Sequence, residues 1–148
     1  MLMKRRILRV LLAVSLALAL CLNASAVISQ SDSFYVADGA EVLSPSTETR
    51  ILEMNDVLTR RCSGAQLVVV SVSYMDGLGA DEYAYTLMND WGVGSAQENN
   101  GMLLVFATQE NRGWLAVGSG LIGSFDDDAC DAYLEQYFWD SYDDGNYD

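Results

Sequence analysis

The stretch that decides the fold is AQLVVVSV, from Ala65 to Val72, a run of β-branched residues without the apolar–polar alternation of a half-buried strand. Such a strand is typically covered on both faces, as in a parallel or mixed sheet packed between helices. A second run of this kind, MLLVFAT from Met102 to Thr108, follows downstream, and WLAVG from Trp114 to Gly118 is its expected hairpin partner after the turn QENRG. FYVAD, Phe34 to Asp38, is a further short extended segment. These runs predict a small sheet with a buried centre.

Three helices are expected between and after these strands: residues 45 to about 62, 81 to about 91, and 127 to about 140. Ser44 is a suitable N-cap for the first helix, with Pro45 at its first position, and Gly64 ends it. The apolar residues expected on the inner faces are Ile51, Met54 and Leu58; Ala84, Leu87, Met88 and Trp91; and Cys130, Tyr133, Leu134 and Tyr137. The alternation predicts one α/β domain, a three-layer α/β/α sandwich around a small mixed sheet.

The first 26 residues have the pattern of a secretory signal peptide. Basic residues at positions 4 to 6 precede an apolar run, and Ala24-Ser25-Ala26 gives a small-residue cleavage site. The apolar run is shorter than the roughly 20 residues of a membrane span. We therefore expect a signal peptide at 1–26, a flexible leader at 27–33 and an exported bacterial domain at 34–148, extracellular or in the cell envelope. The rival interpretation is an uncleaved N-terminal membrane anchor.

The charge of the chain is strongly negative. The whole chain carries −13, and because the first 26 residues hold four basic and no acidic residues, cleavage leaves a net charge of −17. Nine acidic and no basic residues lie between Asp126 and Asp148. This field repels nucleic acid and anionic lipid and attracts cations, so no nucleic-acid partner is expected. The two interpretations that remain are a solvated acidic surface and calcium binding, since calcium requires several oxygen ligands.

The chain contains no histidine. This excludes Ser-His-Asp and Cys-His catalysis within the chain, and any zinc site with histidine ligands. The cysteines downstream of the signal are Cys62 and Cys130. In an exported protein they could form a disulfide, and the alternative is two small buried residues.

The topology predicts which loops share an end of the sheet. If the strand ending near Val72 runs parallel to the one starting at Met102, the polar loop between Trp91 and Met102 lies at the opposite end from Asp76. The hairpin then returns the chain to the loop's end. The oxygen-bearing residues expected to cluster there are Asn99, Asn100, Ser119, Asp126 and Asp127. Asp38 could join either end.

The chain from Phe34 onward resembles the TPM domain, a family shared by a thylakoid-lumen photosystem II repair protein and bacterial YgcG-type proteins. Five elements match in order. They are YVADGAEVLS (35–44), SGAQLVVVSV (63–72), WGVG with NNGMLLVF (91–106), NRGWLAVGSGLIGSFDDD (111–128) and DGNYD (144–148). The departures are Asn111 and Asn146, each in place of an aspartate, and one extra residue between Gly120 and Asp127.

The resemblance implies a Rossmann-like sandwich, an extracytoplasmic location, calcium or other divalent-cation binding in some members, and acid phosphatase activity in the plant member. Many bacterial members also carry a membrane segment and a low-complexity tail after the domain. It therefore suggests Asp38, Asn99, Asn100, Asp126 and Asp127 as metal ligands. No catalytic nucleophile is identified in the sequence.

Each candidate ligand also has a structural interpretation. Asn99-Asn100-Gly101 is typical of a turn, and Asp126 with Asp127 is typical of the start of a helix. Three functions follow: a calcium-binding interaction or quality-control module of the cell envelope, a metal-dependent acid phosphatase, and a ligand-free scaffold. The partners expected are a protein at the envelope and the membrane itself, reached through an uncleaved N-terminus or a segment beyond Asp148.

Overall fold

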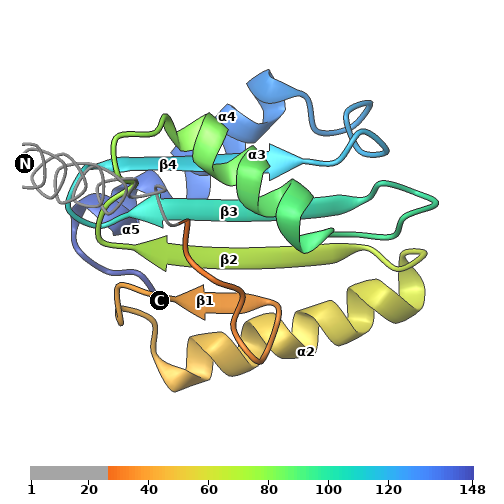
Figure 1. Ribbon diagram of the computed structural model, residues 1–148, viewed down its shortest axis with the longest axis horizontal. Helices are drawn as coiled ribbons and strands as arrows, with labels where there is room; N and C mark the ends of the chain where they lie inside the picture. The colour runs from red at the N-terminus through yellow and green to blue at the C-terminus, as the bar shows by residue number, and fades with distance from the viewer. Residues whose placement is uncertain (1–26) are drawn as a thin grey trace, which may run out of the picture.

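The computed structural model describes residues 27–148, so the predicted signal peptide lies outside the described residues. One sheet has the strand order β1-β2-β3-β4. The strands are β1 (Val36–Asp38), β2 (Gln66–Val72), β3 (Gly101–Ala107) and β4 (Arg112–Val117). The first three are parallel, and β4 pairs antiparallel with β3 (Figure 1). The predicted mixed sheet is confirmed.

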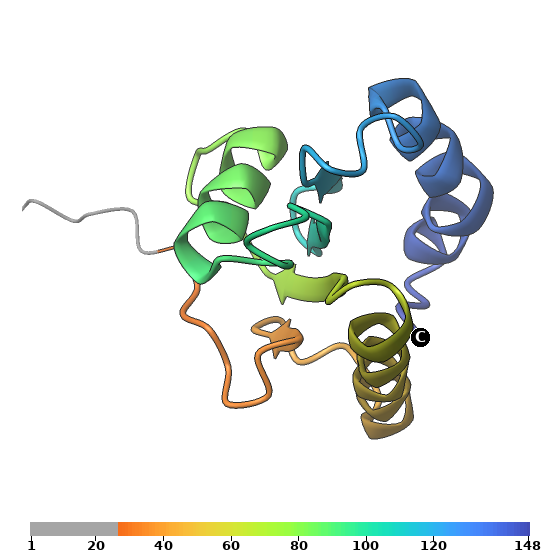
Figure 2. The same cartoon turned by 90° about the vertical axis from the view of Figure 1, so that its right-hand side faces the viewer.

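Helices cover both faces of this sheet. They are α2 (Pro45–Arg61), α3 (Ala80–Trp91), α4 (Asp127–Tyr137) and α5 (Trp139–Asp143). Figure 2 shows α3 on one face of the sheet and α2, α4 and α5 on the other. The predicted three-layer α/β/α arrangement is therefore confirmed.

The two faces of the sheet build two separate apolar layers. Val68, Val70 and Leu103 point toward α3 and have no exposed surface. Phe106 points to the opposite layer, where the ring of Tyr147 stacks on it with centroids 5.6 Å apart. Burial on both faces explains why the central strands read as continuous apolar runs.

Helix α2 begins as predicted but faces the core differently. Ser44 is its N-cap and accepts a hydrogen bond from the Thr47 amide. Met54, expected on the inner face, is 45% exposed, and the buried residue one position further is Asn55. The prediction for Met54 was wrong because apolar periodicity does not register a polar side chain that satisfies its bonds inside the core.

The C-terminal helix predicted over 127–140 is two helices. Helix α4 ends at Tyr137, and Phe138 joins it to the short α5. Cys130 and Leu134 are buried as expected, but Tyr133 is 48% exposed and Tyr137 68% exposed. These two tyrosines stack on each other, with ring centroids 6.0 Å apart, instead of packing on the sheet.

The segment 27–33, expected to be a flexible leader, lies against the domain. Val27 and Ile28 pack on the apolar layer beneath α3, and the Ile28 amide donates to the Tyr83 hydroxyl at 3.1 Å. The Ser31 hydroxyl donates to the Val36 carbonyl. The segment is anchored because its first two side chains are apolar and find half-buried positions.

Candidate functional site

Three segments meet backbone to backbone at the end of the sheet where the polar loop lies. The reason is glycine: a Cβ on Gly101 would lie 2.2 Å from the Val93 carbonyl oxygen, and one on Gly118 would lie 2.1 Å from the Asn99 carbonyl oxygen. A Cβ on Gly120 would lie 1.8 Å from the carbonyl oxygen of Glu98. Any other residue at these positions would push the segments apart.

Backbone hydrogen bonds fix this contact. The Gly118 amide donates to the Gly101 carbonyl at 2.8 Å, and the Gly120 amide donates to the Asn99 carbonyl at 3.0 Å. Within the loop, the Asn99 amide donates to the Ser95 carbonyl at 2.7 Å, and Asn99 has a φ of 48°. The loop between α3 and β3 is therefore held in a defined conformation against the connector after β4, and its backbone forms a wall at this end of the sheet.

Asn100 holds the loop to the end of α2. Its Oδ1 accepts from the Ser95 amide at 3.0 Å, and its Nδ2 donates to the carbonyls of Cys62 and Ser63 at 3.0 and 3.2 Å. Its side chain is buried, with 7% of the residue exposed. The predicted ligand oxygen of Asn100 is thus already engaged in positioning the loop.

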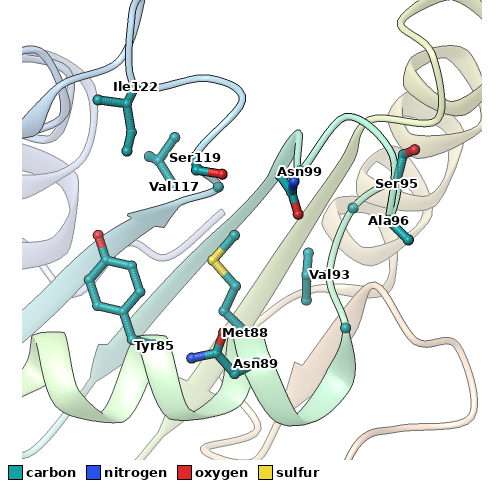
Figure 3. Close-up of a pocket in the computed structure, with 13 residues that line it drawn as sticks. Tyr85, Met88, Asn89, Val93, Ser95, Ala96, Asn99, Val117, Ser119 and Ile122 are labelled. Atoms are coloured by element: carbon teal, nitrogen blue, oxygen red, sulfur yellow. The ribbon is translucent and has the colours of Figure 1, made fainter.

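A pocket of about 470 Å³ opens beside this wall, between α3, the polar loop and the connector after β4 (Figure 3). Met88, Val93 and Val117 provide apolar lining. The polar residues of the lining are Tyr85, Asn89, Ser95, Asn99 and Ser119. Among residues 27–148, no charged side chain lines the pocket. The arrangement suits a partly apolar group with neutral hydrogen-bonding atoms.

The two aspartates expected at this end of the sheet begin α4. Asp126 is its N-cap and accepts from the Ala129 amide at 2.9 Å, and Asp127 lies in the first turn. Both are exposed, and neither lines the pocket. Their helix-start role is therefore observed, while each keeps a carboxylate oxygen available to solvent.

Asp38 lies at the other end of the sheet. Strand β1 runs parallel to β2, and Asp38 pairs with Ser71 in register, close to the carboxyl end of β2. Its carboxylate accepts from the amides of Val42 and Leu43 at 3.1 and 2.9 Å, and from the Ser71 hydroxyl. Asp38 thus shapes the turn before α2 and is separate from the other four candidates.

The five candidate ligands do not form one set. Within residues 27–148, no group of three or more acidic or cysteine side chains is arranged to hold a metal ion. Met88, Val93 and Val117 were assigned to no site, because apolar residues at strand or helix spacing indicate core. No sequence signal distinguishes an apolar residue at a pocket from one beneath a helix.

The thiols are separate. Cys62 is exposed at the end of α2, and Cys130 is buried in α4; they are not bonded to each other. Burial, followed by the negative charges of Asp127, Asp131 and Asp126, raises the pKa of the Cys130 thiol. Neither the disulfide nor a pair of buried cysteines is observed. In the part of the chain that is described, no helix is long and apolar enough to cross a membrane.

Comparisons with known proteins agree with this architecture. The model of the TPM domain family matches residues 36–148. The solution NMR structure of the N-terminal domain of a P. gingivalis protein is similar, with a TM-score of 0.69 and 25% identity over 79% of this chain and 74% of that one. That of a Corynebacterium glutamicum protein has a TM-score of 0.57 and 21% identity over 82% and 78%. The comparison with curated proteins found no match.

Proposed function

The chain belongs to the TPM domain family, and from this premise we propose that it is an extracytoplasmic interaction module that contacts a partner through the pocket beside α3. The observation that carries the proposal is a pocket with a neutral, partly apolar lining, one side of which is formed by closely packed backbone segments. Preformed concave sites of this composition suit ligand or side-chain binding. The secretory pattern of residues 1–26 supports the location.

A neutral lining favours binding over phosphate hydrolysis. An acid phosphatase needs groups that neutralise phosphoryl oxygens and activate water. The pocket contributes amides, hydroxyls and backbone groups, with no arginine, lysine or carboxylate among its lining residues. The geometry thus supports an interaction module more strongly than the alternative of a metal-dependent acid phosphatase.

The test is site-specific photo-crosslinking in the bacterial envelope. A photoreactive phenylalanine analogue placed at Ser119, which lines the pocket, should capture one or a few discrete partners. The matched control is the same analogue at Ser124, which is exposed on the same connector but does not line the pocket. Equal products from both positions, or none from Ser119, would count against the pocket as the contact site.

A second function, calcium binding, is favoured by the charge around this end of the sheet. The amide of Asn99 reaches the pocket, and Asp126 and Asp127 begin the helix that follows the connector. We propose that a cation binds weakly at the surface between them, with water completing its shell. The supporting observation is the shared sheet end together with the net charge of −17 after signal removal, as counted from the sequence.

Calcium titration distinguishes this function from the first. Calcium that binds only the folded state raises the free energy of unfolding by about 2.7 kcal/mol at a hundredfold excess over Kd, and the melting temperature rises with it. Asp127→Asn should abolish the shift, whereas Asp144→Asn, an exposed aspartate after α5, should retain it. A shift of equal size in both variants would indicate non-specific screening of the acidic surface. No shift in the wild type would exclude calcium binding and leave the interaction function to the crosslinking test.

A further inference from the structure

Strand β4 forms an edge of the sheet. The Gly118 amide donates to the Gly101 carbonyl, which makes these two residues a hydrogen-bonded pair of the antiparallel ladder. Because bonded and non-bonded pairs alternate along such a ladder, the N–H and C=O groups of Gly113, Leu115 and Val117 point away from β3. The outer side of β4 therefore presents a row of backbone donors and acceptors.

This edge lacks several of the devices that usually protect an edge strand. Within residues 27–148 these outward groups have no hydrogen-bond partner, and no strand lies beyond β4. The stretch from Gly113 to Val117 contains no proline and no charged side chain. Native edge strands are commonly protected by such residues, so an unprotected edge is a site where another extended chain can pair.

The helices beside β4 define the charge of that chain. Both α3 and α4 contact β4, one from each face (Figure 2). They carry no basic residue; their acidic residues are Asp81, Glu82, Asp90, Asp127, Asp128, Asp131 and Glu135. The basic residues of the described chain are three arginines on α2, which packs against β1 and β2, and Arg112 at the start of β4.

We propose that a basic, extended peptide segment of a partner protein adds to β4 as a fifth strand. Its backbone pairs with Gly113, Leu115 and Val117, and its basic side chains, which alternate along the strand, lie on one face near the acidic residues of α4. Val117, the last residue of β4, also lines the pocket, so the same peptide continues into the pocket with an apolar side chain. This rests on the proposed interaction function and names the chemistry of its partner.

The probe is a blocked seven-residue peptide that alternates lysine with valine. We expect it to bind the domain of residues 27–148, to slow amide exchange at Gly113, Leu115 and Val117, and to weaken several-fold as salt is raised from about 50 to 500 mM. The same peptide with N-methyl groups on alternate residues keeps its charge but cannot form the ladder. It should bind about tenfold more weakly, because two or three hydrogen bonds are lost.

Each outcome decides the proposal. If the methylated and unmethylated peptides bound equally well, charge attraction alone would explain binding, and strand addition would be overturned. Slower amide exchange at β1 in place of β4 would also overturn strand addition at this edge. Equal affinity of a glutamate–valine peptide would overturn the basic partner. No binding at all would overturn the inference but leave the proposed function standing if the crosslinks from Ser119 remain.

A variant of the protein gives a second readout. Asp127→Asn combined with Asp131→Asn on α4 should weaken the lysine–valine peptide several-fold, and the matched pair Asp143→Asn and Asp144→Asn beyond α4 should not. Both pairs remove the same charge. Equal weakening by the two pairs would mean that net charge, and not the position of β4 between acidic helices, sets the affinity.

Discussion

Asn55 is a buried polar residue whose side-chain nitrogen and oxygen are both hydrogen-bonded. Its amide nitrogen donates to the carbonyls of Ile51 and Leu67, at 2.9 and 2.7 Å, and its oxygen accepts from the Leu67 amide at 2.8 Å. These bonds hold α2 against the start of β2. Removing it leaves backbone groups of Leu67 without their partners at the helix–strand contact.

Asn55→Ala should therefore lower the free energy of unfolding by about 2–3 kcal/mol, since each lost partner leaves a desolvated group. Urea denaturation measures the change. Met54→Ala, at the adjacent exposed position, is the control and should stay within about 0.5 kcal/mol of the wild type. If the two variants were equally stable, the bonds of Asn55 would contribute nothing net.

The same residue scale shows which side-chain roles could be predicted. Ser44 and Asp126 were identified as helix caps because the chemistry of a cap is local: an oxygen must meet an amide two or three residues later. Asp38 and Asn100 looked equally well suited to bind a cation. The Ser71 hydroxyl donates to the Asp38 carboxylate, and the Asn100 side-chain nitrogen donates to the Cys62 carbonyl. Because these partners are distant in sequence, only the fold reveals that both side chains are already engaged.

At the scale of elements, the contact between the polar loop and the connector after β4 depends on Gly118. Gly118→Ala places a methyl group 2.1 Å from the Asn99 carbonyl, so one backbone segment must move. We expect a loss of about 1–3 kcal/mol, typical of overpacking, together with changed amide resonances around the pocket.

The control for this substitution lies on the same connector. A Cβ at Gly123 would meet nothing within 4 Å, so Gly123→Ala should change the unfolding free energy by no more than about 0.5 kcal/mol. Thermal denaturation and amide spectra compare the two. A neutral Gly118→Ala variant would show that the loop relaxes freely and is not the rigid wall on which the proposed function depends.

The start of α2 is also an element-scale device, because it joins the two ends of the domain. The Ser44 amide donates to Asp148 Oδ1 at 2.8 Å, and this bond lowers the pKa of the Asp148 carboxyl. A carboxyl whose pKa is lower in the folded state stabilises the protein above its unfolded pKa, near 3.9, and loses that contribution as the pH falls through the folded value.

The stability difference between wild type and Asp148→Asn should consequently stay constant from pH 7 to about pH 5 and shrink below about pH 4. Urea denaturation at each pH provides the values. Asp144→Asn is the comparison, because no hydrogen bond of its carboxylate is present among the described residues. A difference that persisted at the lowest pH would exclude the charged Asp148–Ser44 bond as its cause.

At the scale of the whole molecule, the position of the pocket is the informative feature. Open α/β sheets usually bind ligands beyond the carboxyl ends of their parallel strands. Here the pocket lies at the amino end of β3. At the carboxyl end of the parallel strands, the Asp38 carboxylate accepts from the Val42 amide and the Glu110 carboxylate accepts from the Met75 amide. The site is thus formed where the antiparallel β4 returns the chain.

That the polar loop and the connector share this end of the sheet could be predicted from the sequence, because it follows from topology alone. A parallel crossover followed by a hairpin brings the polar loop and the connector together, whatever their side chains do. The direction of β1 was not accessible, since three residues carry too little pattern to orient a strand. The packing of residues 27–33 was not accessible either, because two apolar side chains in a polar stretch do not reveal their destination.

That packing leads to a prediction about the complete domain. Val27 and Ile28 pack on the apolar layer beneath α3, and the Ile28 amide donates to the Tyr83 hydroxyl. A chain beginning at Phe34 should therefore be less stable than one beginning at Val27. The expected difference is about 1–3 kcal/mol, the amount for partly exposing two aliphatic side chains. Ile28→Ala in the longer chain should reproduce part of the loss. Gln30→Ala, at an exposed position of the same segment, should reproduce none of it. Thermal melting of the four chains measures the contribution of this segment to stability. Equal melting temperatures for the long and short chains would show that residues 27–33 behave as a flexible leader.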